Sequence, residues 1–216
     1  MARPSGRRNE DYEEKRSALI DRLTRFVLDE GVNLPSLRQL AIAADTSQPT
    51  LNHYFGNRTG IIIAIIERMA RMSAPLRDQM KRPAGTLEES LADYARLAGR
   101  LSSRKSYMNA HIFAIREGMN NPEVFKANDE GLLQTAIDAL AERLVKSEGG
   151  PVNCAQAQVA GRMMMACAMM DALRNMLNGS RDAASIDTSD YPTMLNWLAH
   201  GVIRDPNARR TPQAAK

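Results

Sequence analysis

The chain contains little cysteine, little histidine and no pattern that would join the two into a metal site. Cys154 and Cys167 are the only cysteines among 216 residues. Both are predicted to lie on one helix, about 20 Å apart along its axis, which is too far for a disulfide within the chain. The three histidines are scattered, and no Cys/His cluster has zinc-ligand spacing. We therefore expect buried thiols, no metal and no cofactor.

Long apolar segments are also missing. The longest runs are IIIAII from Ile61 and MMMACAMM from Met163, far short of the roughly 20 residues that span a bilayer. The arginines near the N-terminus are followed by the acidic stretch NEDYEE and not by an apolar core, so this end is no secretory signal. The sequence predicts a soluble, cytoplasmic protein without contact to a membrane.

The chain also lacks alternating β-branched segments. Ala, Leu, Met, Arg and Glu recur along nearly its whole length, as is typical of helices. A hydrophobic content of 44% is sufficient for a substantial core. The predicted fold class is therefore all-α.

The net charge excludes fewer classes of function than the amino-acid composition does. The net charge of +4 is modest and does not by itself indicate a nucleic-acid partner. Arg3, Arg7 and Arg8 nevertheless precede the first acidic residue, and we expect residues 1–9 to form a flexible basic arm. Such an arm can follow phosphates or a minor groove, or can be a solubilising tail. Residues 205–216 are predicted to be disordered.

Residues 36–61, SLRQLAIAADTSQPTLNHYFGNRTGI, predict two short helices joined by a turn. Ser36 and Gln39 have the spacing of a capping box that begins the first helix. An apolar face then follows at helical spacing, formed by Leu37, Leu40, Ala41 and Ala44. Ser47 caps the second helix, whose first turn tolerates Pro49. This is a helix-turn-helix, and its second helix can lie in a DNA major groove.

The second helix carries polar side chains on its free faces, while Leu51 and Phe55 point inward. Amide, hydroxyl and imidazole groups read base edges or bind phosphates. Base contacts are expected from the N-terminal part of this helix, and backbone contacts from Tyr54 and Arg58 and from the cap at Ser36. The candidate DNA-binding residues are Ser36, Ser47, Gln48, Thr50, Asn52, His53, Tyr54, Arg58, Arg7 and Arg8.

This segment resembles the DNA-binding part of the TetR family of one-component transcriptional regulators. The matching positions are Leu40-Ala41, Ala44, Ser47, Thr50-Leu51, Tyr54-Phe55 and Arg58. Asp45 stands where the family has Gly, Asn52 where it has Tyr, and Arg58 where it has Lys. Asp can adopt the left-handed conformation of such a turn, and Asn52 changes base preference or phosphate contact. Two Ala-rich core helices would explain the apolar positions equally well, but not the polar ones.

The rest of the chain can be divided around this motif. A helix within residues 10–31, with Tyr12 and Leu19 on its apolar face, completes a three-helix domain of residues 10–58. The second domain, residues 59–204, begins with a helix that is apolar all round at its start. Other elements must therefore cover this helix on several sides. It is interrupted at Pro75. Further helices are predicted at 86–102, 105–119, 122–148, 154–178 and 190–204.

The two last predicted helices indicate a subunit contact. The helix from Cys154 has two apolar edges, which suggests burial within its own subunit and against another. The TetR resemblance implies that both helices pair with their symmetry mates in a four-helix bundle; the other possibility is two core helices of a monomer. The candidate interface residues are Met163, Met170, Leu173, Leu177, Leu195, Leu198 and Val202.

A small ligand is indicated by aromatic and methionine-rich positions in the second domain. The candidate contacts are Tyr94, Tyr107, His111, Phe113 and Met164. Flexible methionines suit an adaptable apolar pocket and a dimer seam equally well, so both possibilities stay open. The usual catalytic and nucleotide-binding motifs are missing, and we expect no enzyme.

Together these features predict a homodimeric DNA-binding regulator. The resemblance implies a repressor that a small apolar or aromatic effector releases from a palindromic operator. The alternatives are a helical ligand-binding protein that has lost DNA binding and, less favoured, a helical enzyme.

Overall fold

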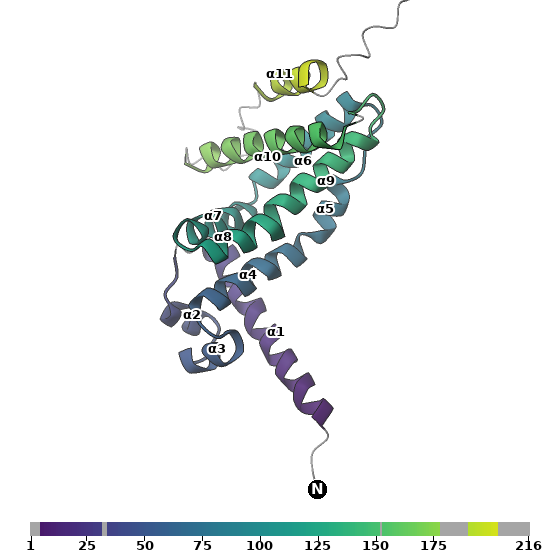
Figure 1. Cartoon of the computed structure of the whole chain (residues 1–216). Coiled ribbons are helices and arrows are strands. Elements are labelled where there is room, and N and C mark those ends of the chain that lie inside the picture. The colour runs from purple at the N-terminus through teal and green to yellow at the C-terminus, as the bar shows by residue number, and fades with distance from the viewer. Residues whose placement is uncertain (1–4, 32–33, 152, 178–189, 203–216) are drawn as a thin grey trace, which may run out of the picture. The chain divides into compact units, whose positions relative to one another are not determined.

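A computed structural model describes residues 5–31, 34–151, 153–177 and 190–202 of the chain (Figure 1). Within these ranges the regular secondary structure is helical, apart from an isolated bridge between Thr86 and Glu148. The predicted all-α class is confirmed. The helices are α1 (Ser5–Glu30), α2 (Leu37–Ala43), α3 (Gln48–Phe55), α4 (Arg58–Met72), α5 (Ala74–Met80), α6 (Leu87–Ser102), α7 (Lys105–Asn120), α8 (Pro122–Asn128), α9 (Gln134–Lys146), α10 (Cys154–Leu177) and α11 (Asp190–Trp197).

The described residues fall into two compact units, and each contains two stretches of the chain. The first unit comprises residues up to 74 together with 105–133, and the second comprises 75–104 together with residues from 134 onward. The unit that contains the helix-turn-helix is therefore larger than the predicted domain of residues 10–58, since it also includes residues 59–74 and 105–133. The reason is that one hydrophobic cluster joins Leu40 and Leu51 to Ile61 on α4 and Phe113 on α7.

Helix α4 is central to the first unit. Its buried side chains lie on several faces, and α1, α3, α7 and α8 all contact it. A helix with so much apolar surface stabilises a fold only when its neighbours cover it. The fully buried members are Ile61, Ile62, Ile65 and Ile66. The expectation of a helix covered on several sides is thereby met.

Helix α1 begins earlier than the sequence analysis predicted. Residues 5–9 are helical, so the flexible arm of residues 1–9 is wrong for this part. No Gly or Pro interrupts the chain between Arg7 and Glu30, and Arg and Glu are good helix formers that extend a helix beyond its packed portion. Arg7 and Arg8 thus lie on a helical backbone, while their side chains are outside the described part of the structure.

Two predicted helices are interrupted. The expected break near Pro75 occurs at Ser73, between α4 and α5. The predicted helix 122–148 is divided by a π-helical turn, Asp129–Leu133. The predicted helix 190–204 begins as α11 and continues as a second π-helical turn, Leu198–Val202. The first of these turns packs against α4, where a Cβ at Gly131 would lie 3.8 Å from the side chain of Ala70, an ordinary van der Waals contact.

The second unit is built on α10, which packs against α9 and α6. One edge of α10 is buried, with Ala160 and Met164 fully covered. The opposite edge carries Val159, Met163 and Met170, which remain exposed. The two apolar edges expected for this helix thus face two different environments.

A buried arginine ties α9 to α6 in the second unit. The side chain of Arg143 is only 1% exposed and forms an ion pair with Asp93. It also donates from Nε to the carbonyl oxygen of Ser90 at 3.1 Å. The guanidinium beside Asp93 holds the pKa of this carboxyl group below its usual value. Asp93 is itself partly exposed, so solvent moderates the interaction.

We predict that Asp93→Ala lowers the free energy of unfolding by about 2 kcal/mol, because Arg143 loses its partner while it stays buried. Chemical denaturation at pH 7 measures the loss. The carboxylate stabilises the fold above its unfolded pKa, so the difference between wild type and variant should shrink as the pH falls below about 4. The matched control is Asp78→Ala, which removes an exposed carboxylate 3.8 Å from Lys81 and should change stability by less than about 0.5 kcal/mol. Equal effects of the two variants would contradict this account.

Candidate nucleic-acid interface

The helix-turn-helix begins with the predicted capping box. Ser36 Oγ accepts from the backbone N–H of Gln39 at 3.2 Å, and the Gln39 amide oxygen accepts from the backbone N–H of Ser36 at 2.8 Å. Helix α2 buries Leu40 and Ala41, and Ala44 follows them into the core. The cap residue remains exposed.

The turn between α2 and α3 has the left-handed residue that the sequence required. Asp45 adopts φ +52°, a region that Asp enters at lower cost than most residues other than Gly and Asn. The preceding carbonyl, that of Ala44, accepts from Arg22 Nη1 on α1 at 2.9 Å. Helix α1 therefore holds the turn as well as the core.

Helix α3 presents a polar surface over a single buried residue, Leu51. Ser47 Oγ accepts from the backbone N–H of Thr50 at 3.2 Å and lies 2.8 Å from the Thr50 hydroxyl. Thr50 is half-buried by this contact. The side chains that remain exposed on α3 are Gln48, Pro49, Asn52 and His53. Three of these four offer groups that can bond a base edge.

Aromatic contacts from α1 orient the C-terminal half of α3. The ring of Tyr12 lies 4.7 Å from that of Tyr54 and, edge-on, 5.8 Å from that of His53. The guanidinium of Arg16 lies over the Phe55 ring at 5.2 Å. Such pairs add to apolar burial and restrict ring orientation. The sequence pattern places Tyr12 on an apolar face but does not indicate this role, because i, i+4 spacing does not reveal which helix the face meets.

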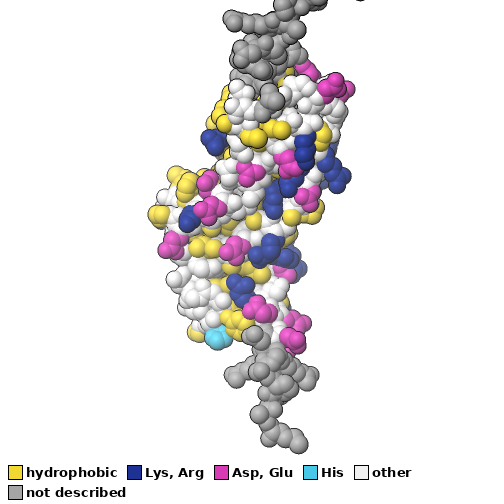
Figure 2. Space-filling model, turned by 45° about the vertical axis from the view of Figure 1, so that its right-hand side comes forward, with side chains coloured by type: hydrophobic (Ala, Val, Ile, Leu, Met, Phe, Trp, Pro, Cys, Tyr) yellow, Lys and Arg dark blue, Asp and Glu magenta, His cyan; other side chains and the backbone are white. Residues whose placement is uncertain are grey.

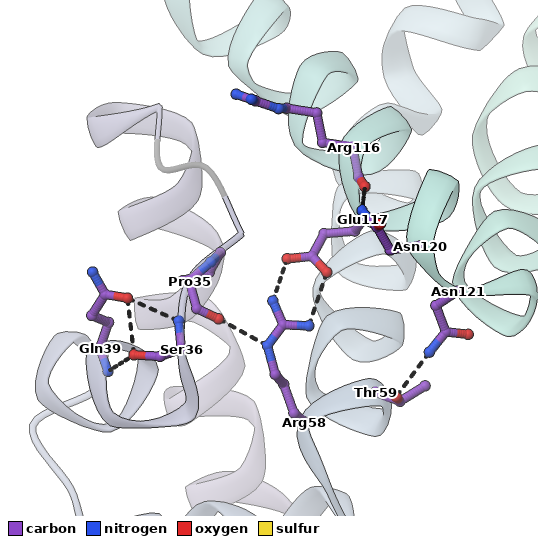
Figure 3. Close-up of polar contacts among 9 residues, drawn as sticks. All are labelled: Pro35, Ser36, Gln39, Arg58, Thr59, Arg116, Glu117, Asn120 and Asn121. Carbon is purple, nitrogen blue, oxygen red and sulfur yellow. Dashed lines mark hydrogen bonds and ion pairs between the residues drawn. The ribbon is translucent and has the colours of Figure 1, made fainter.

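The side chain of Arg58 binds within the protein, whereas the sequence predicts that it contacts the DNA backbone. Its Nη2 and Nη1 donate to the two carboxylate oxygens of Glu117, at 2.6 and 3.0 Å, and its Nε donates to the carbonyl oxygen of Pro35 at 2.9 Å (Figure 3). The prediction of a phosphate contact is therefore corrected, since the guanidinium fork is engaged within the protein. No sequence signal pointed to Glu117, which stands in an ordinary stretch of α7.

The predicted effector residues do not form one group. Phe113 belongs to the core of the first unit, while Tyr94 and Met164 are buried in the second unit. Tyr107 and His111, one helical turn apart on α7, are only half-buried and have their ring centroids 4.6 Å apart. Desolvation raises the pKa of Tyr107 to about 12 and lowers that of His111 to about 4. Both are therefore neutral at pH 7.

The predicted interface residues also separate into two classes. Met163 and Met170 are exposed on α10, and Leu173 is half-buried. Leu195 is buried on α11, which contacts α6, and Leu198 is buried on the turn Leu198–Val202, which contacts α10. Both are core residues of their own unit, which corrects their assignment to the interface. The side chains of Leu177 and Val202 are outside the described part of the structure.

Two further observations limit the kinds of site present. Among the described residues, no group of His, Cys, Asp and Glu could hold a metal ion, and no helix there is long and apolar enough to cross a membrane. Figure 2 shows Lys and Arg side chains interspersed with Asp and Glu on the face drawn, without a continuous patch of one sign.

Comparison with known proteins gives matches in structure only. No protein-family model matches the chain, and no curated protein matches it. Among solved structures, the fatty acid degradation regulator FadR from Bacillus halodurans has a TM-score of 0.59 at 16% identity, covering 88% of this chain and 97% of that one. GusR from Salmonella enterica has a TM-score of 0.59 at 19% identity, covering 88% and 95%. The transcriptional regulator FadR from Bacillus subtilis, solved in complex with stearoyl-CoA, has 0.57 at 15%, covering 86% and 98%.

The chain has the fold of these helical regulators. The likeness extends over nearly the whole of each neighbour, so the helix-turn-helix and the helices that follow it belong to one shared architecture. At these identities, it is the arrangement of helices that is shared. What the chain recognises has to be argued from its own residues.

Proposed function

We propose that this chain is a DNA-binding transcriptional regulator of the TetR type that represses transcription from a palindromic operator. The observation that carries the proposal is the exposed set Gln48, Asn52 and His53 on a short helix whose opposite side is buried and held by α1. A core helix would not leave an amide pair and an imidazole together on its surface. The fold shared with helical transcription regulators supports the same conclusion.

The roles along α3 follow from its geometry. Gln48, Asn52 and His53 would face base edges, since amides pair with adenine and imidazole can donate or accept. Thr50 and Ser47, which bond each other, and the Tyr54 hydroxyl would contact the duplex backbone, as would the exposed cap Ser36. Arg7 and Arg8 would add phosphate contacts from the start of α1.

Selection of bound sequences from random DNA by the purified protein should enrich a palindrome. Asn52→Ala should then weaken operator binding by about 1 to 3 kcal/mol and relax the preference at one base pair in each half-site. The matched control is Asn120→Ala, because Asn120 is an exposed asparagine of α7 whose side chain donates to the Arg116 carbonyl of its own helix. The operator affinity of this variant should equal that of the wild type. Failure of the wild type to enrich any sequence would favour the alternative, a helical ligand-binding protein that has lost DNA binding.

A palindromic operator requires a symmetric dimer, and α10 offers the surface for it. Val159, Met163 and Met170 are 48%, 41% and 58% exposed and recur on one face of the helix, with Ala166 between them. A row of large apolar side chains on a helix that already has a buried edge is typical of an isologous contact. We propose that this edge meets its symmetry mate, extended by Leu173.

We predict that Met170→Glu yields monomers in sedimentation velocity at micromolar concentration, because like charges would meet across the two-fold axis. Operator affinity should fall together with dimerisation. Met119→Glu is the control, since Met119 is 80% exposed on α7 and is not part of this edge; it should remain dimeric. A wild-type protein that sediments as a monomer would refute the proposed interface.

The effector is proposed to contact Tyr107 and His111. Both rings keep accessible surface although their polar groups are desolvated, and neither is charged at pH 7. Such a site favours an uncharged apolar or aromatic molecule with one hydrogen-bonding group over an anion. Release would follow if this molecule binds better to a dimer whose α3 helices are wrongly spaced for the operator.

A panel of uncharged aromatic and aliphatic molecules, with stearoyl-CoA as an anionic comparison, can be tested for release of labelled operator by fluorescence anisotropy. We expect an uncharged member to release it equally at pH 6 and pH 8, since His111, with a pKa of about 4, stays neutral over this range. His111→Phe should weaken the release and leave operator affinity without effector unchanged. Release by stearoyl-CoA alone would contradict the proposed effector class.

A further inference from the structure

Glu117 is a buried carboxylate in the first unit. Its side chain is 3% exposed, and its two oxygens accept from Arg58 at 2.6 and 3.0 Å. Removing a charge from water is costly even when the charge is paired, and a well-packed apolar pair is often at least as stable. Stability alone therefore does not explain a buried carboxylate at this position.

Arg58, the partner of Glu117, lies where the helix-turn-helix meets α4. Arg58 is the first residue of α4 and follows the recognition helix α3 closely. Its Nε donates to the carbonyl of Pro35, the residue before the cap of α2. One guanidinium thus joins the entrance of α2, the start of α4 and the C-terminal part of α7 (Figure 3).

A second contact reinforces the same joint. Asn121, which caps α8, donates from Nδ2 to the hydroxyl of Thr59 at 3.0 Å. Asn57 caps α4 by accepting from the backbone N–H of Gly60 at 2.9 Å. The start of α4 is therefore fixed to the α7–α8 corner by two adjacent side chains, and both ends of the α2–α3 pair adjoin it.

We infer that Glu117 is a positioning residue for DNA recognition: it holds Arg58, and through the Pro35 carbonyl it sets the orientation in which α2 and α3 meet the duplex. The guanidinium donates to both carboxylate oxygens and to the carbonyl from one rigid plane, a geometry that the flexible ammonium of a lysine does not preserve. The inference rests on the proposed DNA binding and assigns Arg58 to the protein's own framework in place of a phosphate.

The two roles for Arg58 make opposite predictions. A phosphate contact contributes about one unit to the slope of log K against log salt. Under that role, Arg58→Lys would keep most of the affinity, and Glu117→Gln would keep it or raise it by removing a negative charge. A positioning role predicts that both variants lose affinity, about tenfold each, with the salt slope unchanged. It also predicts that the double variant is no weaker than either single one, since both remove the same interaction.

The experiment measures affinity for the selected operator by fluorescence anisotropy across a salt series, for wild type, Glu117→Gln, Arg58→Lys and the double variant. Glu130→Gln is the control, because this carboxylate is 68% exposed and pairs only loosely with Lys126; it should bind like the wild type. Thermal unfolding followed by circular dichroism establishes that each protein is folded. If Glu117→Gln does not fold, Arg58→Lys still decides between the two roles.

Loss of affinity at constant slope supports the inference. Wild-type affinity in Glu117→Gln or in Arg58→Lys overturns it. If the wild type itself enriches no operator, the proposed function fails instead, and the two failures are thereby distinguished.

Discussion

The first unit depends on the need to cover helix α4. Its run of buried isoleucines has apolar surface on several sides, and no single neighbour can bury all of it. Helices α1, α7 and α8 pack around it, and α3 contacts it near its start. The helix-turn-helix is consequently part of a larger core, and the orientation of α3 follows from how α4 is packed.

This constraint explains how α3 can be so polar. With Leu51 as its one fully buried residue, α3 has too little apolar surface to hold its own place, and a helix of this length is marginal in isolation. Its position comes from the Ser47 cap, from Tyr12 and Arg16 on α1, and from its junction with α4. The exposed residues of α3 are therefore not needed for packing, and their side chains are available for contacts outside the protein.

Charged side chains have two distinct roles in this molecule. Those on the surface are mixed in sign (Figure 2) and are worth little individually. The pairs Arg58–Glu117 and Arg143–Asp93 instead lie at helix junctions, one pair in each unit, and each has one buried member, Glu117 or Arg143. In each pair the guanidinium also bonds a backbone carbonyl, so it fixes the chain path of a neighbouring segment as well as neutralising a charge.

The sequence by itself determined the features that depend on residues close together in the chain. The capping box at Ser36, the left-handed residue Asp45 and the two edges of α10 could all be predicted from spacing, because each involves residues within a few turns of one another. Only the tertiary structure decided which helix meets which face. Arg58 was matched to Glu117 across 59 positions, Leu198 was buried instead of exposed, and Tyr107 was separated from Tyr94. Periodicity specifies that a face is buried, but it contains no information about the partner, which depends on how all the helices pack at once.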